Sequence, residues 1–363
     1  MRQNADMARR VFLHIGTPKS GTTYLQDRLA LNRDAIAKHG PTYLPTRTGN
    51  HFEAALDLIE ERWAGQREVA RGQWLALVAE AKRTSGDIVI SHEILAAASS
   101  EQVAKVMAAF SEDEVHVVLT VRDLARQIPA EWQELLKHRG RRSFKKFMSE
   151  IVQGRRNSPT LWFWRVQSIP DVLTRWGNGL PPRQVHVVTV PPKGGPPGEL
   201  WERFARVLGF DPAVAVVEST NFNPSLGVAE ASTIRRLNKL LAGRGVPREV
   251  YIDLVRDVIV RNTLGPRTDS IPVVVPEPRW RFVETVTEEW REWIEGAGVD
   301  VVGDLTDLVP LRPGPDHVWV HPDEPPAEAV ADAALVSLAA VISGVAPSHR
   351  ISVRRLARRL LRG

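Results

Sequence analysis

A loop of glycine and hydroxyl-bearing residues near the start of the chain has the composition of an anion-binding site. The stretch HIGTPKSGTTYLQ, residues 14–26, follows an apolar run and leads into a helical pattern. In that setting glycines allow a tight turn, and the backbone N–H groups that open the helix point at a common anion. Gly16 and Gly21 have the spacing of the glycines in the phosphate-binding sequence G-x-x-x-x-G-K-[ST]. Thr22 stands where that sequence has its lysine, and Lys19 comes three residues earlier.

The loop resembles the 5′-phosphosulfate-binding loop of sulfotransferases, whose signature is P-K-S-G-T-T followed by an aromatic residue. Residues 18–24 read PKSGTTY. The resemblance implies that the loop binds 3′-phosphoadenosine 5′-phosphosulfate (PAPS) and that Lys19 contacts its bridging and sulfuryl oxygens. The cofactor-binding residues that it implies in the loop are Thr17, Pro18, Lys19, Ser20, Gly21, Thr22 and Thr23.

A second feature of that family is a strand that ends in arginine and is followed further on by serine, both of which bind the 3′-phosphate. Arg122 ends the apolar run 115–121 and is the implied ligand, but Ala130 occupies the serine position. The R-K-G loop that closes the nucleotide pocket in the cytosolic branch has no recognisable counterpart. These departures indicate a resemblance to a divergent bacterial branch of the family.

The resemblance also implies a general base just beyond another strand, where the run DIVISHEIL contains His92 and Glu93. The base must take a proton from the acceptor hydroxyl, and imidazole titrates near neutrality. His92 occupies the family position, and Glu93 is the alternative because some relatives that act on polysaccharides use glutamate. A structural His–Glu pair with the base elsewhere, as at His51, is left open. We expect His51, in a turn before a helix, to contact either solvent or the acceptor.

The apolar pattern predicts the elements that must hold these residues. Helical patterns such as 22–40 and 100–110 separate β-branched runs without alternation, which indicates an α/β fold with a parallel sheet covered on both faces. We expect a P-loop-NTPase-like sheet flanked by helices, with a largely helical C-terminal part from about residue 200. The predicted strands are 11–16, 87–91, 115–121 and 185–190.

Composition and charge divide the chain further. We expect a sulfotransferase-like domain over 1–310, a proline-rich linker and alanine-rich helix over 311–347, and a basic tail over 348–363. The tail holds six arginines and no acid, and without them the net charge of +5 falls to −1. A near-neutral body does not favour nucleic acid as a partner. The tail has an apolar stripe at helical spacing, which suits an anionic membrane surface or a partner groove. A disordered or self-docked tail fits the sequence at least as well.

Other features exclude several classes of protein. The chain has no cysteine, which excludes disulfides, zinc–thiolate sites and a cysteine nucleophile. The first residues lack the apolar run of a signal peptide, and we expect a cytoplasmic protein. The alanine-rich run 329–346 carries Asp332 and is expected to pack on the body as a helix. No metal is expected, because Lys19 and the helix N-terminus serve the anion directly.

The leading hypothesis is transfer of a sulfuryl group from PAPS to the hydroxyl of a carbohydrate, a glycolipid or a small metabolite. A P-loop kinase or NTPase would need lysine at position 22 and a strand ending in an acid for Mg²⁺. The run 115–121 ends instead in Arg122, with Asp123 behind it. The alternative outside enzymology is a sulfotransferase-fold module that binds nucleotide or a partner without turnover.

Overall fold

The structure is a computed structural model that describes residues 8–60, 67–154, 160–221, 224–314 and 317–345. Contacts divide the chain into two compact units. The first unit comprises residues 1–127, 153–222 and 279–311, and the second comprises residues 128–152, 223–278 and 312–363. The predicted tail 348–363 lies outside the described residues.

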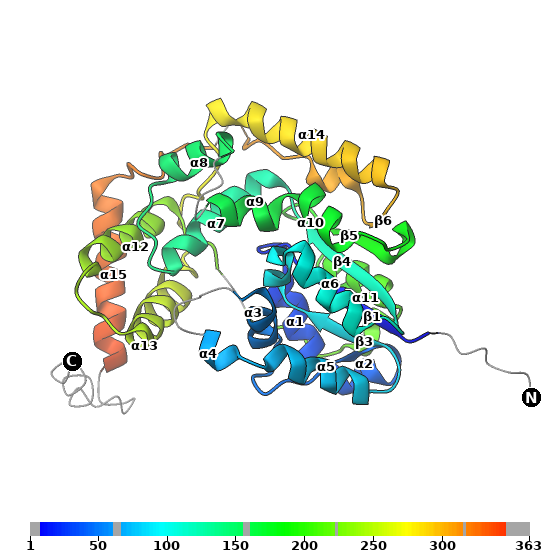
Figure 1. The fold of residues 1–363 in the computed structure, drawn as a ribbon. Helices are drawn as coiled ribbons and strands as arrows, with labels where there is room; N and C mark the ends of the chain where they lie inside the picture. Colours follow the sequence, from blue (N-terminus) through cyan, green and yellow to red (C-terminus); the bar gives the residue numbers. More distant parts are fainter. Residues whose placement is uncertain (1–7, 61–66, 155–159, 222–223, 315–316, 346–363) are drawn as a thin grey trace, which may run out of the picture. The chain divides into compact units, whose positions relative to one another are not determined.

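A parallel sheet of six strands forms the centre of the first unit, in the order β2-β3-β1-β4-β5-β6 (Figure 1). All five pairs of neighbouring strands are parallel. The strands are β1 (Arg10–His14), β2 (Thr42–Tyr43), β3 (Ile88–Ser91), β4 (Glu114–Val121), β5 (Val185–Thr189) and β6 (Asp300–Val302). The predicted strands are thus confirmed within one or two residues, and β2 and β6 extend the sheet at its edges.

The strands are buried on both faces. On one face Phe12 and Val118 belong to an apolar cluster with Leu25 of α1 and Phe204 of α11. On the other face Leu13 has no exposed surface. Burial of both faces explains why these strands read as continuous β-branched runs, and the predicted α/β class is confirmed.

The helices of the first unit are α1 (Thr22–Leu31), α2 (Arg33–Ala37), α3 (Phe52–Ile59), α4 (Arg67–Ala70), α5 (Gln73–Arg83), α6 (Ser100–Ala109), α9 (Thr160–Gln167), α10 (Ile169–Trp176), α11 (Glu199–Leu208) and α14 (Trp280–Ala297). The short 3₁₀ turns of this unit are η1 (Glu93–Ala97), η2 (Pro182–Gln184), η3 (Pro212–Val214) and η6 (Leu305–Leu308).

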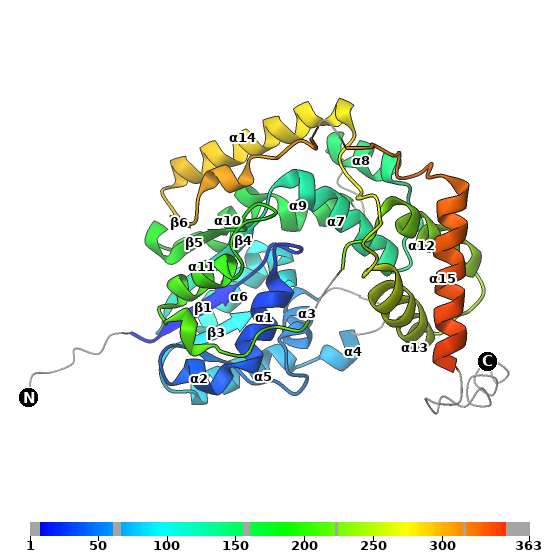
Figure 2. The same ribbon diagram turned by 180° about the vertical axis from the view of Figure 1, so that it is seen from behind.

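The sheet order creates a topological switch at β1. From β1 the chain runs to β2 and β3 on one side, and then crosses to β4 on the other side. In open α/β sheets, ligands bind outside the carboxyl ends of the strands at such a switch. The three predicted site segments follow β1, β3 and β4, so the topology brings them to one edge of the sheet. Figure 2 shows the loop after β1 turning back into α1.

The predicted helix 22–40 is broken at Asn32 into α1 and α2. The Asn32 side chain donates to the carbonyl oxygens of Arg28 (2.9 Å) and Val217 (2.8 Å) and accepts from the Val217 N–H (2.9 Å). These bonds to a segment far along the chain compete with continuation of the helix.

The second unit is helical in its described part. Helix α7 (Leu124–Lys137) starts in the first unit, and its residues from Ile128 onward belong to the second. The other elements are α8 (Phe144–Val152), α12 (Val228–Leu241), α13 (Arg248–Tyr251), the π-helix η4 (Ile252–Leu264), the 3₁₀ turn η5 (Glu277–Arg279) and α15 (Ala327–Val345). Helix α15 confirms the predicted alanine-rich helix, and it packs on α12 and η4 (Figure 1).

This division differs from the predicted boundaries, which assign all of 1–310 to one domain. The difference arises because α12 and η4 pack against α15, so segments distant in sequence form one unit. Composition does not record such pairings between segments that are distant in the sequence.

Gly303 provides a test of the packing at the end of β5. Its φ is +116°, and a Cβ there would lie 2.1 Å from Thr189 Oγ1 and 2.5 Å from Arg203 Nη1. We predict that Gly303→Ala lowers the free energy of unfolding by about 2–4 kcal/mol, from strain plus overpacking. Gly298→Ala is the matched control, because its φ is +62° but no atom lies within 4 Å of the added Cβ. Equal shifts of the urea midpoint for both variants would contradict the packing.

Candidate active site

The loop between β1 and α1 has a backbone that requires glycine at position 16. Gly16 has a φ of +115°, and a Cβ there would lie 3.0 Å from the backbone oxygen of Glu93. Gly21 caps α1 with a φ of +85°. Lys19, which is not glycine, also has a positive φ of 65°. A lysine in the left-handed region is uncommon, so the surrounding structure must hold this turn.

Thr120 of β4 holds the loop against the sheet. Its carbonyl oxygen accepts from the Thr17 N–H (2.7 Å), and its own N–H donates to the Gly16 oxygen (2.5 Å). Its hydroxyl bonds the Ser20 hydroxyl (2.6 Å), which lies 2.5 Å from the Thr17 oxygen. Thr17 and Ser20 are buried. These two predicted cofactor-binding residues therefore use their side chains to shape the loop.

Two glutamine side chains hold the loop by hydrogen bonds to its backbone, and no role for either of them is predicted from the sequence. Gln127 and Gln167 both donate to the carbonyl oxygen of Pro18, at 2.7 and 2.9 Å. Gln127 also donates to Gln167 Oε1 (2.8 Å). Both side chains are buried. They fix the peptide that directly precedes Lys19, and no motif in the sequence marks them.

The N-terminus of α1 is positively polarised and suits the binding of an anion. Its first turn, from Thr22, contains no acidic residue, and its cap residue, Gly21, provides no side-chain hydrogen bond to the helix N-terminus. The first N–H groups of a helix have no partner within the helix, and the helix dipole makes this end positive. With Lys19 in the preceding turn, the predicted residues Gly21, Thr22 and Thr23 lie where an anion would be held.

His14 is a structural histidine of the strand, as its place in the apolar run suggests. Its Nδ1 lies 2.7 Å from Ser91 Oγ and its Nε2 lies 3.2 Å from Thr120 Oγ1. Burial lowers the pKa of His14 to about 3. The neutral ring therefore ties together the ends of β1, β3 and β4.

His92 lies directly beyond β3, at the edge of the sheet that carries the loop. Its N–H donates to the His14 oxygen (3.0 Å), and its Nδ1 accepts from the Ile94 N–H (3.3 Å). Because Nδ1 is an acceptor, the neutral ring carries its proton on Nε2. Burial holds the pKa of His92 below its usual range, against the opposing charge of Glu93.

Glu93 lies in the same electrostatic cluster as Lys19. Its Oε2 accepts from Gln26 Nε2 of α1 (2.9 Å) and lies 3.8 Å from His92 Nδ1. Its side chain is 23% exposed. Burial alone would raise the pKa of Glu93, but His92, the Gln26 hydrogen bond and the charge of Lys19 together hold it below its usual range. Glu93 is therefore ionised at neutral pH.

Arg122 follows β4 at the same edge of the sheet. Its side chain is half-buried, and Nη2 donates to the Arg126 oxygen (3.0 Å). Asp123 is buried and forms an ion pair with Arg126. Ala130 lies in the part of α7 that belongs to the second unit. In the parts of the chain that the structure describes, no group of three His, Cys, Asp or Glu residues is arranged to hold a metal ion.

His51 lies away from solvent, at a strand junction. Its Nε2 donates to the Leu44 oxygen (2.8 Å), and its Nδ1 accepts from the Ser91 N–H (2.9 Å). The residue has no exposed surface. Both ring nitrogens are thus used by the backbone of neighbouring strand ends. We assign His51 a structural role and do not carry its predicted acceptor contact into the proposal.

Comparison with known proteins finds a similar solved structure. No family model matches the chain, and no curated protein matches it. A crystal structure of a sulfotransferase from Alicyclobacillus acidocaldarius is similar, with 14% identity, 68% of this chain and 99% of that chain covered, and a TM-score of 0.41.

The buried histidines make the stability of the fold depend on pH. Burial lowers the pKa of His51 to about 4, against an ordinary value of 6.5. The unfolded chain then binds more protons below pH 6.5, so His51 stabilises the fold above that pH and less as pH falls toward 4. Between pH 7.5 and 5 we predict a loss of about 2 kcal/mol from this residue.

The variant His51→Gln tests this prediction, because an amide can donate to Leu44 and accept from Ser91 but cannot be protonated. Urea unfolding at the two pH values is expected to show a smaller loss of stability for the variant than for the wild type. An identical loss in both proteins would contradict a neutral, buried His51.

Proposed function

We propose that this protein is a PAPS-dependent sulfotransferase that transfers a sulfuryl group to the hydroxyl of an acceptor. The observation that carries the proposal is the placement of Lys19. It lies in a left-handed turn just before the N-terminus of α1, which has glycine as its cap residue and no acid in its first turn. These donors suit a phosphosulfate, which is strongly anionic and has a phosphate and a sulfuryl group joined through one oxygen. They can bind it directly, without a metal ion between protein and ligand. Arg122, at the same sheet edge, is the proposed ligand of the 3′-phosphate.

Bound PAPS would supply a sulfuryl group activated by its bond to a phosphate oxygen. Lys19 and the N–H groups of Gly21 and Thr22 would stabilise the negative charge that grows on that phosphate during transfer. Preorganised donors of this kind usually contribute the largest part of catalysis. Gln127 and Gln167 would contribute indirectly, because they hold the Pro18 carbonyl and hence the orientation of the turn.

We assign the general base to Glu93 and a positioning role to His92. Glu93 is ionised and partly exposed, and Gln26 orients its carboxylate. His92 is buried, and its Nδ1, the nitrogen that would take a proton, already accepts a backbone N–H. Glu93 would take the hydroxyl proton late, as the attacking oxygen becomes acidic on bonding to sulfur. The acceptor is a hydroxylated small molecule or carbohydrate.

Removing the Lys19 charge should slow transfer while leaving the fold intact. Lys19→Ala is expected to lower kcat/KM by roughly 10²–10³, the cost of one charge-stabilising donor. The measurement is incorporation of ³⁵S from labelled PAPS into a panel of hydroxylated acceptors. Lys38→Ala, at an exposed lysine that follows α2, is the matched control and should keep wild-type activity. Full activity of Lys19→Ala would overturn the assignment, and no turnover by the wild type on any acceptor would favour a binding module.

Glutamine substitutions separate the two candidate bases. Glu93→Gln keeps the hydrogen-bonding shape and should lower kcat by roughly 10²–10⁴, the usual contribution of a general base, with little change in nucleotide affinity. His92→Gln should have the smaller effect on kcat. Because Glu93 has a lowered pKa, wild-type kcat should stay level as pH falls from 7 to 5. The reverse order of the two variants, with a fall in kcat below pH 6.5, would assign the base to His92 instead.

A further inference from the structure

Helix α15 has an inverted distribution of side chains. Its buried positions are Val330, Ala333 and Ser337, of which only Val330 is a large apolar residue. Most of its large apolar side chains point away from the unit: the exposed ones are Leu335 (65% exposed), Val336 (39%), Leu338 (56%) and Ile342 (63%). A helix on the surface of a water-soluble unit normally places such residues inward. The outer face of α15 therefore suits an apolar environment.

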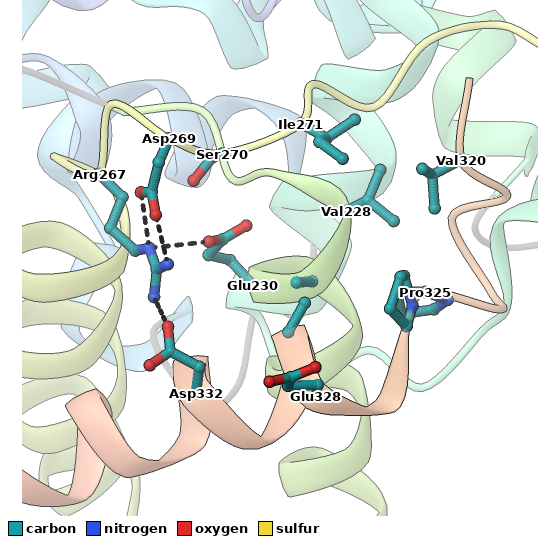
Figure 3. Close-up of a pocket in the computed structure, with 13 residues that line it drawn as sticks. Val228, Glu230, Arg267, Asp269, Ser270, Ile271, Val320, Pro325, Glu328 and Asp332 are labelled. Carbon is teal, nitrogen blue, oxygen red and sulfur yellow. Dashed lines mark hydrogen bonds and ion pairs between the residues drawn. The ribbon is translucent and has the colours of Figure 1, made fainter. Parts of the chain in front are cut away.

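An ion-pair network fixes the start of this helix. Arg267 donates to Asp332 of α15 (2.9 Å) and to Asp269 (2.9 Å), and pairs with Glu230 of α12 (3.2 Å) (Figure 3). These residues line a cavity of about 360 Å³ that also contacts Glu328. Because Asp332 is held on one side by Arg267, the helix cannot rotate to bury its apolar face without breaking the network.

The composition of α15 matches a membrane environment in length and hydropathy. The window Ala327–Gly344 has a mean hydropathy of 1.6 and is long and apolar enough to cross a bilayer, while only 17% of it is buried. One side of the helix, however, already packs on α12 and η4. A helix that keeps one side on protein can insert only its other side, which describes an interfacial helix rather than a spanning one.

We propose that the outer face of α15 binds the surface of an anionic lipid bilayer, together with the arginine-rich segment that follows it. From Ala333 to the end the sequence has no acidic residue, and residues 350–362 contain six arginines. An apolar face followed by a cluster of arginines is the combination that stable interfacial binding requires. The inference does not depend on the proposed transfer activity.

Charge favours lipid over a second copy of the chain as the occupant. The acids of α15 are Glu328 and Asp332, and Asp332 is already paired with Arg267. A second α15 would thus bring apolar surface but few free negative charges for six arginines. An anionic membrane offers both an apolar layer and a dense negative surface.

Co-sedimentation of the full chain with vesicles tests the proposal. Binding is expected to equimolar phosphatidylcholine and phosphatidylglycerol, to weaken with added salt, and to be much weaker with phosphatidylcholine alone. The variant Leu335→Gln, Leu338→Gln and Ile342→Gln should lower the partition coefficient roughly tenfold or more. Its matched control changes three exposed apolar residues elsewhere: Leu75→Gln, Val216→Gln and Leu240→Gln. The control should bind like the wild type.

A second variant distinguishes the contribution of the arginines to vesicle binding from that of the apolar face. Replacing Arg354, Arg355, Arg358 and Arg359 by glutamine should abolish the preference for phosphatidylglycerol. Stronger vesicle binding by this variant would show that the segment covers α15 instead, and would overturn the proposal. Equal vesicle binding by the α15 variant and its control would also overturn the proposal. The same holds if the wild type binds no vesicles but forms dimers, and the α15 variant is monomeric.

Discussion

The hydrogen bonding of one residue, Thr120, determines the shape of the candidate site. Its backbone continues the β1–β4 pairing past the end of β1, and its hydroxyl reaches both Ser20 and His14. The loop is therefore held as an extension of the sheet up to Thr17, and only beyond that residue does it turn into α1. This pairing leaves Lys19 in the turn and aims the helix N-terminus at the same place. Polar groups buried without partners are costly, so the network that satisfies them also specifies one loop conformation.

Much of this arrangement is readable from the sequence, because it depends on local features. The strands β1, β3, β4 and β5 are β-branched runs, and the glycines of the loop mark a backbone that other residues cannot adopt. The two edge strands, of two and three residues, are too short to produce a pattern. Asn32, Gln127 and Gln167 act through contacts between distant segments, which no spacing in the sequence records. The same limitation applies to His51: its turn-like surroundings suggest exposure, whereas its two backbone hydrogen bonds place it in the core.

The charges around the loop explain how the Glu93 carboxylate can lie next to a candidate anion site. Glu93 would repel an anionic ligand if it stood alone, but Gln26 donates a hydrogen bond to its carboxylate and the positive charge of Lys19 offsets its negative charge. Under the proposed function, Lys19 would act on two anions, the Glu93 carboxylate before the nucleotide binds and the phosphosulfate afterwards. Gly16 allows this proximity, since any side chain there would meet the backbone of Glu93. The need for glycine at this position thus comes from the close approach of Glu93 as much as from the turn.

The central claim is that the loop is built for a phosphosulfate nucleotide rather than for a triphosphate with Mg²⁺. Calorimetric titration of the full chain with adenosine 3′,5′-bisphosphate in chelator-treated buffer, and separately with ATP plus Mg²⁺, tests it most directly. We predict saturable binding of the bisphosphate that needs no metal ion, and much weaker binding of ATP. Saturable binding of ATP with Mg²⁺, and none of the bisphosphate, would contradict the account.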